Sequence, residues 1–344
     1  MKGRDHEIRK IRIANRAAAV GRLMLGEFDD WAEFIRAANV DLGSVPRRQL
    51  KSGPKDIQGR LSPGIRRFRG NNFENMTEQK LAELCEVIEP NLGFEMPLIE
   101  FEGKFGHIKP HARKGCPPHS TVHISLWGLQ FEFPERHRVA DILQAVSLAR
   151  NAKNELAKYS GGSHLGVVGH KSDVASLRQR LLYGSRTCVL CCFNLVESYL
   201  NGVAWKFSLD TENIESLSER KRKTITDSSG TSIRDKILKY PEIIAGSPLW
   251  NDQAEPVKIF LDDVKPFRDS IVHPSPFSVP EKFGGYDKLR NLYRIDLDHA
   301  ERSAEVVCAL ICRVHSHLNN GNMSYPEWLQ DLMAGIKKGE AGSN

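Results

Sequence analysis

Three residue types that together serve phosphate chemistry occur within six positions of the sequence. Arg268 is followed by Asp269, and His273 stands five residues after the arginine, immediately before Pro274. A guanidinium binds a phosphate through two parallel hydrogen bonds, and an imidazole accepts or donates a proton near neutral pH. This run therefore predicts a site that holds a phosphate and moves a proton, which is the combination that cleavage of RNA requires.

The prolines around this run decide where its side chains point. On a regular helix, residues five apart lie about 140° apart around the axis and do not converge. Pro274 disfavours the helical conformation at His273, so we expect the helix to end at Val272 and the imidazole to turn back toward Arg268. Pro266 lacks a backbone N–H, which predicts either a kink or a new first helical turn just before the run.

An apolar stripe leads into the run. Its residues recur at three- and four-residue steps, the spacing of one buried face of an amphipathic helix. This spacing places Arg268 beside the stripe rather than opposite it. The stripe consists of Val257, Phe260, Leu261, Val264, Phe267 and Ile271.

A second helix is expected at Cys192–Gly202, where Glu197 and Asn201 stand four residues apart and share one face. Together with the run from Arg268 to His273, this helix resembles the HEPN superfamily. The signature of these small helical domains is an arginine, usually a polar residue next, and then a histidine. The resemblance covers residues 138–320 and implies that the two helices pack antiparallel and contribute to one polar cleft.

The resemblance implies a metal-independent endoribonuclease without a cofactor. His273 would take the proton of a ribose 2′-hydroxyl or deliver one to the leaving 5′-oxygen, and Arg268 would hold the scissile phosphate. Asp269 would orient Arg268 or the imidazole, while Glu197 and Asn201 would supply polar groups that tune them. The products would be a 2′,3′-cyclic phosphate and a 5′-hydroxyl.

The same resemblance implies a homodimer in which two copies of the motif face each other. RNA would be the substrate, and the protein would act as a toxin or in antiviral defence. An inhibitory protein would be a further partner. The alternative is a catalytically inactive HEPN-like dimer that binds RNA or a protein. A purely structural role is also open, because an Arg–Asp pair at a helix end and a histidine before proline both serve as helix caps.

Composition describes an ordinary globular protein. Of the 344 residues, 40% are apolar and 27% charged, and the net charge of +6 favours an anionic partner such as RNA. No apolar run reaches the roughly 18 residues that cross a bilayer, so no membrane segment is expected. The charged N-terminus does not resemble a secretory signal, and seven irregularly spaced cysteines fit reduced thiols in a cytoplasm.

The chain is expected to be mainly α, with a C-terminal antiparallel HEPN-like helical bundle and an N-terminal α+β region that contains a small β-hairpin or sheet. Composition divides it into a basic helical and linker arm at 1–75, a small α+β element at 76–135, the bundle at 138–320 and a flexible tail at 335–344.

Two basic segments are candidates for RNA contact, with a solvated surface as the alternative for each. The first lies in the run 45–70, which follows a helix expected at 28–38 and is interrupted by enough Pro and Gly that no regular helix is expected there. The second lies between the two motif helices and extends through Arg234, Lys236 and Lys239. The named candidates are Arg66, Arg67, Arg220, Lys221, Arg222 and Lys223.

The 76–135 element begins with a helix, Glu78–Val87, capped by Thr77. Strands are expected at Pro97–Phe105 and Thr121–Phe133. Between and within them lie imidazoles and one thiol, the ligand types of zinc, although their spacing matches no standard zinc finger, and solvated or RNA-contacting histidines are the alternative. The set is His107, His111, Cys116, His119 and His123.

The C-terminal zone shows helical periodicity throughout. A helix is expected at Arg138–Tyr159, then a loop at Gly161–Gly169, then a long helix from Ser172 toward Trp205 with a break near Gly184. Cysteines 188, 191 and 192 lie among large apolar residues in that helix and are expected to be buried. A last long helix is expected at Asp296–Leu318.

Overall fold

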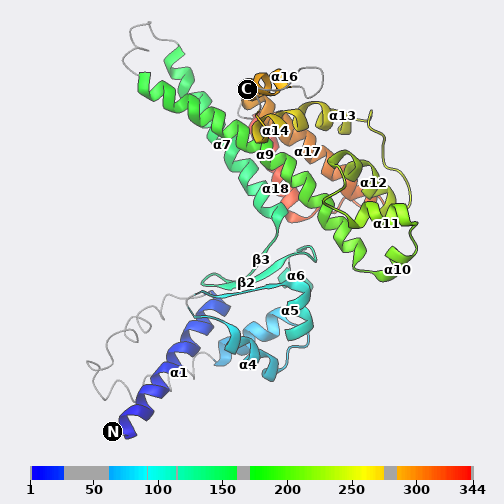
Figure 1. Cartoon of the computed structure of the whole chain (residues 1–344). Coiled ribbons are helices and arrows are strands. Elements are labelled where there is room, and N and C mark those ends of the chain that lie inside the picture. The colour runs from blue at the N-terminus through cyan, green and yellow to red at the C-terminus, as the bar shows by residue number, and fades with distance from the viewer. Residues whose placement is uncertain are drawn as a thin grey trace. The chain divides into compact units, whose positions relative to one another are not determined.

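A computed structural model describes most of the chain, and it is mainly helical with one small sheet (Figure 1). The chain forms two compact units, Met1–Phe133 and Pro134–Asn344. The described residues are 2–26, 62–90, 92–113, 115–160, 171–274 and 285–341.

The N-terminal unit contains the expected small sheet. Its three strands are antiparallel in the order β1-β2-β3. Thr77 caps the first helix of the expected α+β element, since its side chain accepts a hydrogen bond from the backbone N–H of Lys80 at 3.2 Å. Both expectations are confirmed. The named elements are α1 (Lys2–Leu25), α4 (Glu78–Val87), β1 (Phe94–Pro97), α5 (Leu98–Phe105), α6 (Pro110–Arg113), β2 (Thr121–Ser125) and β3 (Gly128–Glu132).

The strand expected at Pro97–Phe105 is wrong, because this segment is helix α5. Leu98, Phe101 and Phe105 follow one another at three- and four-residue steps, and all three are buried. Burying this face on the sheet core outweighs the β-propensity of the aromatic residues. The run Thr121–Phe133 is extended as expected, but it forms two strands, β2 and β3, joined by a tight turn.

The expectation of no regular helix in the run 45–70 is wrong for its last part, because residues 62–72 are mostly helical. Pro63 lies in the first turn, where its missing N–H costs no helical hydrogen bond. Phe68 is buried and its ring contacts Phe73 edge-on at 5.7 Å between centroids. The rest of that run and the helix expected at 28–38 lie outside the described residues.

One core unites the N-terminal unit. Met24 from α1 and Phe68 from residues 62–72 lie in the same buried cluster as Leu84, Phe101 and Ile124. The structure therefore places side chains from the expected arm, 1–75, and from the expected element, 76–135, in a single apolar interior.

Helices α7 and α9 are the longest of the C-terminal unit and run side by side, with α17 packed against both (Figure 1). The long helix expected at Asp296–Leu318 is α17, which begins after its N-cap Asp296, and the loop expected at Gly161–Gly169 lies outside the described residues. The elements are α7 (Pro134–Ser160), α9 (Lys171–Ser208), α10 (Thr211–Glu215), α11 (Glu219–Thr226), α12 (Ile233–Ala245), α13 (Val257–Ile259), the π-helix η1 (Phe260–Val264), α14 (Lys265–Val272), α16 (Gly285–Arg294), α17 (Leu297–Leu318) and α18 (Glu327–Ala341).

The break expected near Gly184 is wrong, because α9 continues through it. Gly184 instead lets α7 approach closely: a Cβ at this position would lie 2.6 Å from the carbonyl oxygen of Ala145 and 3.0 Å from the backbone nitrogen of Ala149. The glycine thus serves packing between helices rather than a change of backbone direction.

The apolar composition of α9 reflects its central position. Cysteines 188, 191 and 192 are free thiols and buried, as expected. Among the described helices, only α9 is long and apolar enough, by length and composition alone, to cross a bilayer. The sequence analysis expected no segment of this kind. Its most apolar window is 56% buried inside the unit, as in the core helix of a bundle.

The flexible tail expected at 335–344 is wrong up to residue 341, because α18 extends that far and residues 342–344 lie outside the described part. Trp328, Leu329 and Leu332 are buried on one side of this helix. Gly335 faces α7 so closely that a Cβ would lie 2.2 Å from the Leu143 side chain. Packing against α7 explains why this glycine does not end the helix.

We expect Gly184→Ala to lower the free energy of unfolding by about 1–3 kcal/mol, because the added methyl group collides with the backbone of α7. Chemical denaturation followed by circular dichroism measures the change. Gly103→Ala in α5 is the control, since nothing lies within 4 Å of its Cβ. That substitution should stabilise its helix by roughly 0.5–1 kcal/mol. Equal stabilisation by both substitutions would contradict the close approach of α7 and α9.

Candidate functional site

The helix that carries Arg268 is built in three parts. The short α13 leads into the π-helix η1 and then into α14, and Ile259, Val264 and Lys265 at the junctions all keep right-handed helical backbone angles. The helix therefore runs on through Pro266, and the irregularity before the motif is a π turn in which Lys265 donates its N–H to the carbonyl of Phe260. The helix ends at Val272, as expected, and the next residue, His273, has φ −127° and ψ 56° and donates its backbone N–H to the carbonyl of Asp269 at 2.9 Å.

The π turn changes which residues of this helix face the core. Val257, Phe260 and Val264 are buried, as the stripe predicts, whereas Phe267 is only partly buried. The fully buried residue of α14 is Ser270, whose hydroxyl donates to the carbonyl of Pro266 at 2.7 Å. A π turn holds more residues than an α turn, so it rotates everything after it around the helix axis.

Arg268 is held on an aromatic platform. Its guanidinium carbon lies 4.4 Å from the ring centroid of Phe193 in α9, and that ring stacks on Phe260 at 5.8 Å and 17°. A cation over an aromatic face is attracted by the ring quadrupole. The side chain of Arg268 retains 25% exposure, so the guanidinium is positioned and still reaches solvent.

Asp269 holds the same guanidinium from the side. Its carboxylate accepts from Nη1 of Arg268 at 3.0 Å and from Nζ of Lys265 at 2.7 Å. Burial alone would raise the pKa of Asp269, but the hydrogen bonds and charges of Lys265 and Arg268 outweigh burial and lower this pKa. Asp269 therefore orients the arginine, which is one of its two expected roles.

His273 is exposed at the end of α14. Within the described part of the chain, no hydrogen bond or ion pair joins its imidazole to Arg268. The expected turn of the imidazole toward the arginine is thus not accompanied by a bond between the two side chains. The side chain of His273 is thus open to solvent.

Glu197 and Asn201 lie one and two turns after Phe193 on α9, so they share its side of the helix. Glu197 contacts α12 through an ion pair. Oε1 of Glu197 pairs with Nζ of Lys236 at 2.9 Å, and the side-chain oxygen of Asn201 is buried without a hydrogen bond. The structure therefore brings Arg268 and Asp269 together, and it directs Glu197 to a different cation.

Lys236 is the residue of this region that the sequence analysis misplaced. The expectation of a solvated face is wrong for it, since its side chain is 2% exposed. The signal lies in α12, where Ile233, Ile237 and Tyr240 form a buried stripe that includes position 236. A lysine at a core position of an amphipathic helix requires a partner, and Glu197 supplies it.

The basic candidates lie on two separate units. The four basic candidates on α11, residues 220–223, are exposed. Nζ of Lys221 lies 3.6 Å from Oε1 of Glu242. Nη2 of Arg222 lies 3.4 Å from the carbonyl of Leu217, at the start of its own helix. Arg66 and Arg67 are exposed in the N-terminal unit on residues 62–72. Each set is free to contact a polyanion.

The His and Cys residues of the zinc hypothesis do not converge. Across the described residues, no group of three or more His, Cys, Asp or Glu side chains is placed to hold a metal ion. His107 instead lies 3.6 Å from the carboxylate of Glu102, which also forms an ion pair with Arg113 at 3.4 Å and accepts a hydrogen bond from the backbone N–H of Ile108 at 3.1 Å. Glu102 thus organises this loop through polar contacts.

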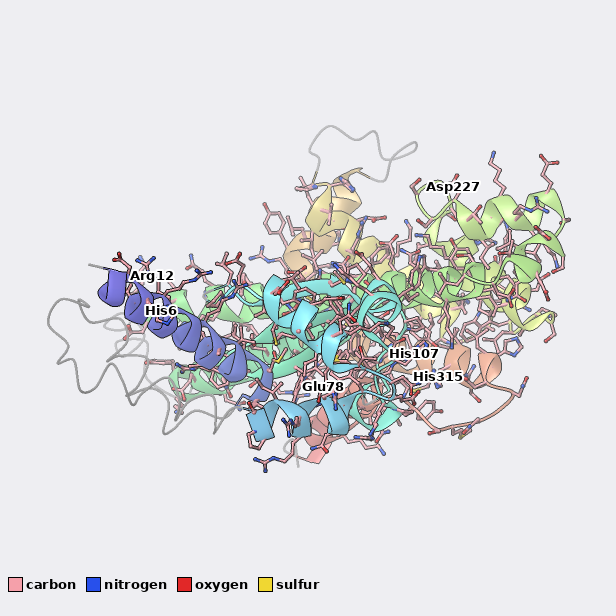
Figure 2. The ribbon with its side chains drawn as sticks, turned by 90° about the horizontal axis from the view of Figure 1, so that it is seen from below. His6, Arg12, Glu78, His107, Asp227 and His315 are labelled. Carbon is pink, nitrogen blue, oxygen red and sulfur yellow. The ribbon has the colours of Figure 1, made fainter. Side chains whose placement is uncertain are left out.

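The surface of the N-terminal unit adds exposed polar groups from another helix. His6 and Arg12 both lie exposed on α1 (Figure 2).

Comparison with protein-family models, with curated proteins and with solved structures finds no match to this chain. Function is therefore argued from the geometry of the site.

The Glu197–Lys236 pair can be tested by a double-mutant cycle. We expect Glu197→Ala to lower the free energy of unfolding by about 1–3 kcal/mol, because it leaves a buried ammonium unpaired. The same change in a Lys236→Met background should cost much less. Lys239→Met is the control, because Lys239 lies on the same helix with a partly exposed side chain and a surface ion pair to Asp235 at 2.6 Å; it should change stability by less than about 0.5 kcal/mol. Equal costs of Glu197→Ala in both backgrounds would contradict the pairing.

The lowered pKa of Asp269 predicts a pH dependence. Its ionised form stabilises the fold above the unfolded pKa of about 3.9, and this contribution disappears as the pH falls through the lower folded pKa. Asp269→Asn should therefore be less stable than the parent by about 0.5–1.5 kcal/mol at neutral pH, with a difference that shrinks below about pH 4. Urea denaturation from pH 3 to 7 measures it. The exposed Asp262 of η1 supplies the control Asp262→Asn, whose stability at neutral pH should stay within about 0.5 kcal/mol of the parent.

Proposed function

We propose that the C-terminal unit is a metal-independent endoribonuclease of the HEPN type. The observation that carries the proposal is the placement of Arg268: its guanidinium lies over Phe193 and is held by Asp269, yet it remains partly exposed, five residues from an exposed histidine. An arginine fixed in this way binds a phosphate with little loss of side-chain freedom.

In the proposed reaction, the 2′-oxygen of a ribose attacks the adjacent phosphorus while the bond from phosphorus to the 5′-oxygen breaks. One imidazole accepts the proton of the 2′-hydroxyl, and a protonated imidazole delivers a proton to the leaving 5′-oxygen. Arg268 stabilises the charge that develops on the non-bridging oxygens. The products are a 2′,3′-cyclic phosphate and a 5′-hydroxyl, and neither a metal nor a cofactor takes part.

A homodimer completes the proposal. His273 is one imidazole per chain, and a twofold partner would supply the second, so that one acts as base and the other as acid. Val272 and Tyr293 are large apolar residues, 44% and 79% exposed, on the packed helices α14 and α16. They support self-association on this side of the unit. The exposed basic residues of α11 would then guide RNA, in the toxin or defence setting that the resemblance implies, where an inhibitory protein would restrain the enzyme.

The alternative is a catalytically inactive dimer that binds RNA or a protein. It is favoured by the engagement of Glu197 with Lys236, which takes one expected polar group away from Arg268.

The test is cleavage of labelled single-stranded RNA and tRNA by the purified protein in EDTA. We expect cleavage by the parent with 2′,3′-cyclic ends, and a loss of about 10²–10⁴-fold in rate for His273→Ala. Arg268→Ala should lose about 10²–10³-fold. Arg268→Lys keeps the charge without the planar fork and should remain strongly impaired.

His107→Ala is the matched control, because His107 is an exposed histidine of the other unit whose side chain is 69% exposed. It should cleave at the parental rate. Circular dichroism checks that each variant is folded. If RNA binds but stays intact, the proposed ribonuclease function is wrong and the inactive binding dimer takes its place. The same conclusion follows if the variants at positions 268 and 273 cut RNA as fast as the parent.

A further inference from the structure

A cavity of about 300 Å³ lies beside the helix that carries Arg268. Its first wall comes from the π turn and the start of α14, and its second wall from the first two turns of α17. The volume is at the lower end of the range of small-molecule pockets. The lining residues are Ile259, Asp263, Val264, Phe267, Asp298, His299, Arg302 and Ser303.

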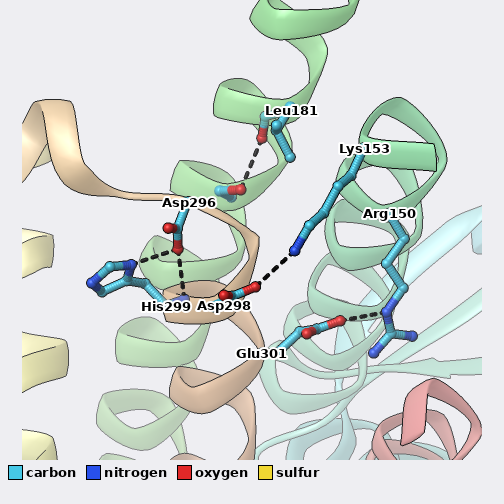
Figure 3. A network of polar contacts seen from close by, with 8 residues as sticks. Arg150, Lys153, Leu181, Asp296, Asp298, His299 and Glu301 are labelled. Atoms are coloured by element: carbon cyan, nitrogen blue, oxygen red, sulfur yellow. Dashed lines mark hydrogen bonds and ion pairs between the residues drawn. The ribbon is translucent and has the colours of Figure 1, made fainter. Parts of the chain in front are cut away.

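Ion pairs between α7 and α17 hold the second wall in place. Nζ of Lys153 in α7 lies 2.9 Å from Asp298, and Nε of Arg150 lies 2.5 Å from Glu301. Figure 3 shows these two pairs together and the imidazole of His299 turned away from them. The charges of α7 thus engage carboxylates of α17 and leave His299 to the cavity.

His299 presents a defined ring nitrogen. Oδ1 of Asp296 accepts from Nδ1 of His299 at 2.6 Å and from its backbone N–H at 3.0 Å (Figure 3). Burial would raise the pKa of Asp296, but the hydrogen bonds from His299 outweigh it and lower this pKa. Because Nδ1 is occupied, Nε2 is the nitrogen that remains for a ligand. The ring meets Phe267 edge-on at 4.6 Å and 72°.

A donor and an acceptor stand side by side at the same cavity. Nη2 of Arg302 lies 3.5 Å from Oδ2 of Asp263, with both side chains about half exposed. This separation exceeds a normal N–H···O hydrogen bond, so the guanidinium and the carboxylate each keep capacity for another partner. The apolar part of the lining consists of Ile259, Val264 and Phe267, while Asp298 and Ser303 complete the wall from α17.

We propose that this cavity binds a single nucleobase. The apolar wall suits a flat ring, and the Watson–Crick edge of every base carries a donor beside an acceptor, which the carboxylate of Asp263 and the guanidinium of Arg302 complement. Unstacked bases of single-stranded RNA are recognised by aromatic contact and by hydrogen bonds to this edge.

The location ties the cavity to the phosphate site, and this step rests on the proposed function. Phe267, a lining residue, is the immediate neighbour of Arg268, about 100° away around α14. An RNA strand held by Arg268 would place a base near the site within reach of the cavity. Cleavage would then depend on the identity of that nucleotide.

The first experiment measures binding without cleavage. The four nucleoside 5′-monophosphates and ribose 5-phosphate are titrated against the full chain, observed by saturation-transfer NMR. We expect at least one nucleotide to bind through its base and ribose 5-phosphate not to compete. Loss of the charged hydrogen bond in Arg302→Gln should weaken binding about tenfold or more. Arg268→Ala should keep this binding to the base.

Arg150→Gln is the matched control, since it removes an Arg–carboxylate pair on the opposite side of the same helix. It should bind like the parent. Equal binding by Arg302→Gln and the parent, or full competition by ribose 5-phosphate, would overturn the base pocket.

The second experiment maps cleavage of a randomised single-stranded RNA at nucleotide resolution. Arg302→Gln should broaden the preferred nucleotide at the cut, while Arg150→Gln leaves the pattern unchanged. If the protein cleaves RNA and Arg302→Gln cuts at the same nucleotides as the parent, the base pocket is wrong, while the proposed ribonuclease function still stands. Base binding without any cleavage would support the pocket and reject the proposed function, so the two failures are distinguishable.

Discussion

Burial of α9 is the constraint on which the C-terminal unit depends. Successive positions of this one helix meet different neighbours: Gly184 admits α7, the thiol of Cys188 lies 3.4 Å from the Ala300 carbonyl of α17, and Phe193 and Glu197 receive Arg268 and Lys236. Each contact requires the helix to run unbroken at a constant rotation. The apolar interior and the polar groups around Arg268 are therefore aligned by the same element.

The long helices were predictable because their periodicity is local. Thr77 caps its helix, Val272 ends α14 and Asp296 precedes α17, as their neighbours in the sequence indicate. The errors arose where tertiary packing outweighed composition. Aromatic residues at 97–105 suggested a strand but bury a helical face, and Pro and Gly in the run 45–70 did not prevent a helix whose Phe68 enters the core.

The candidate site was predictable only in part, because its residues interact over long separations. The pairing of Arg268 with Asp269 follows from adjacency, whereas the platform of Phe193 lies far upstream in the chain. The partner of Glu197 depends on how α12 packs against α9, which periodicity does not reveal. The cavity with His299 likewise requires two helices that the sequence separates, so the spacing of residues gave no sign of it.

The π turn at Phe260–Val264 gives this part of the chain an unusual sensitivity to length. Every residue after it is rotated by the additional residue that the turn contains, about 100° relative to a continuous α-helix. Arg268 reaches Phe193 because of that rotation. Evolution can therefore exchange side chains in the turn more freely than it can delete a residue, since a single deletion would carry the arginine off its platform while the helix itself persisted.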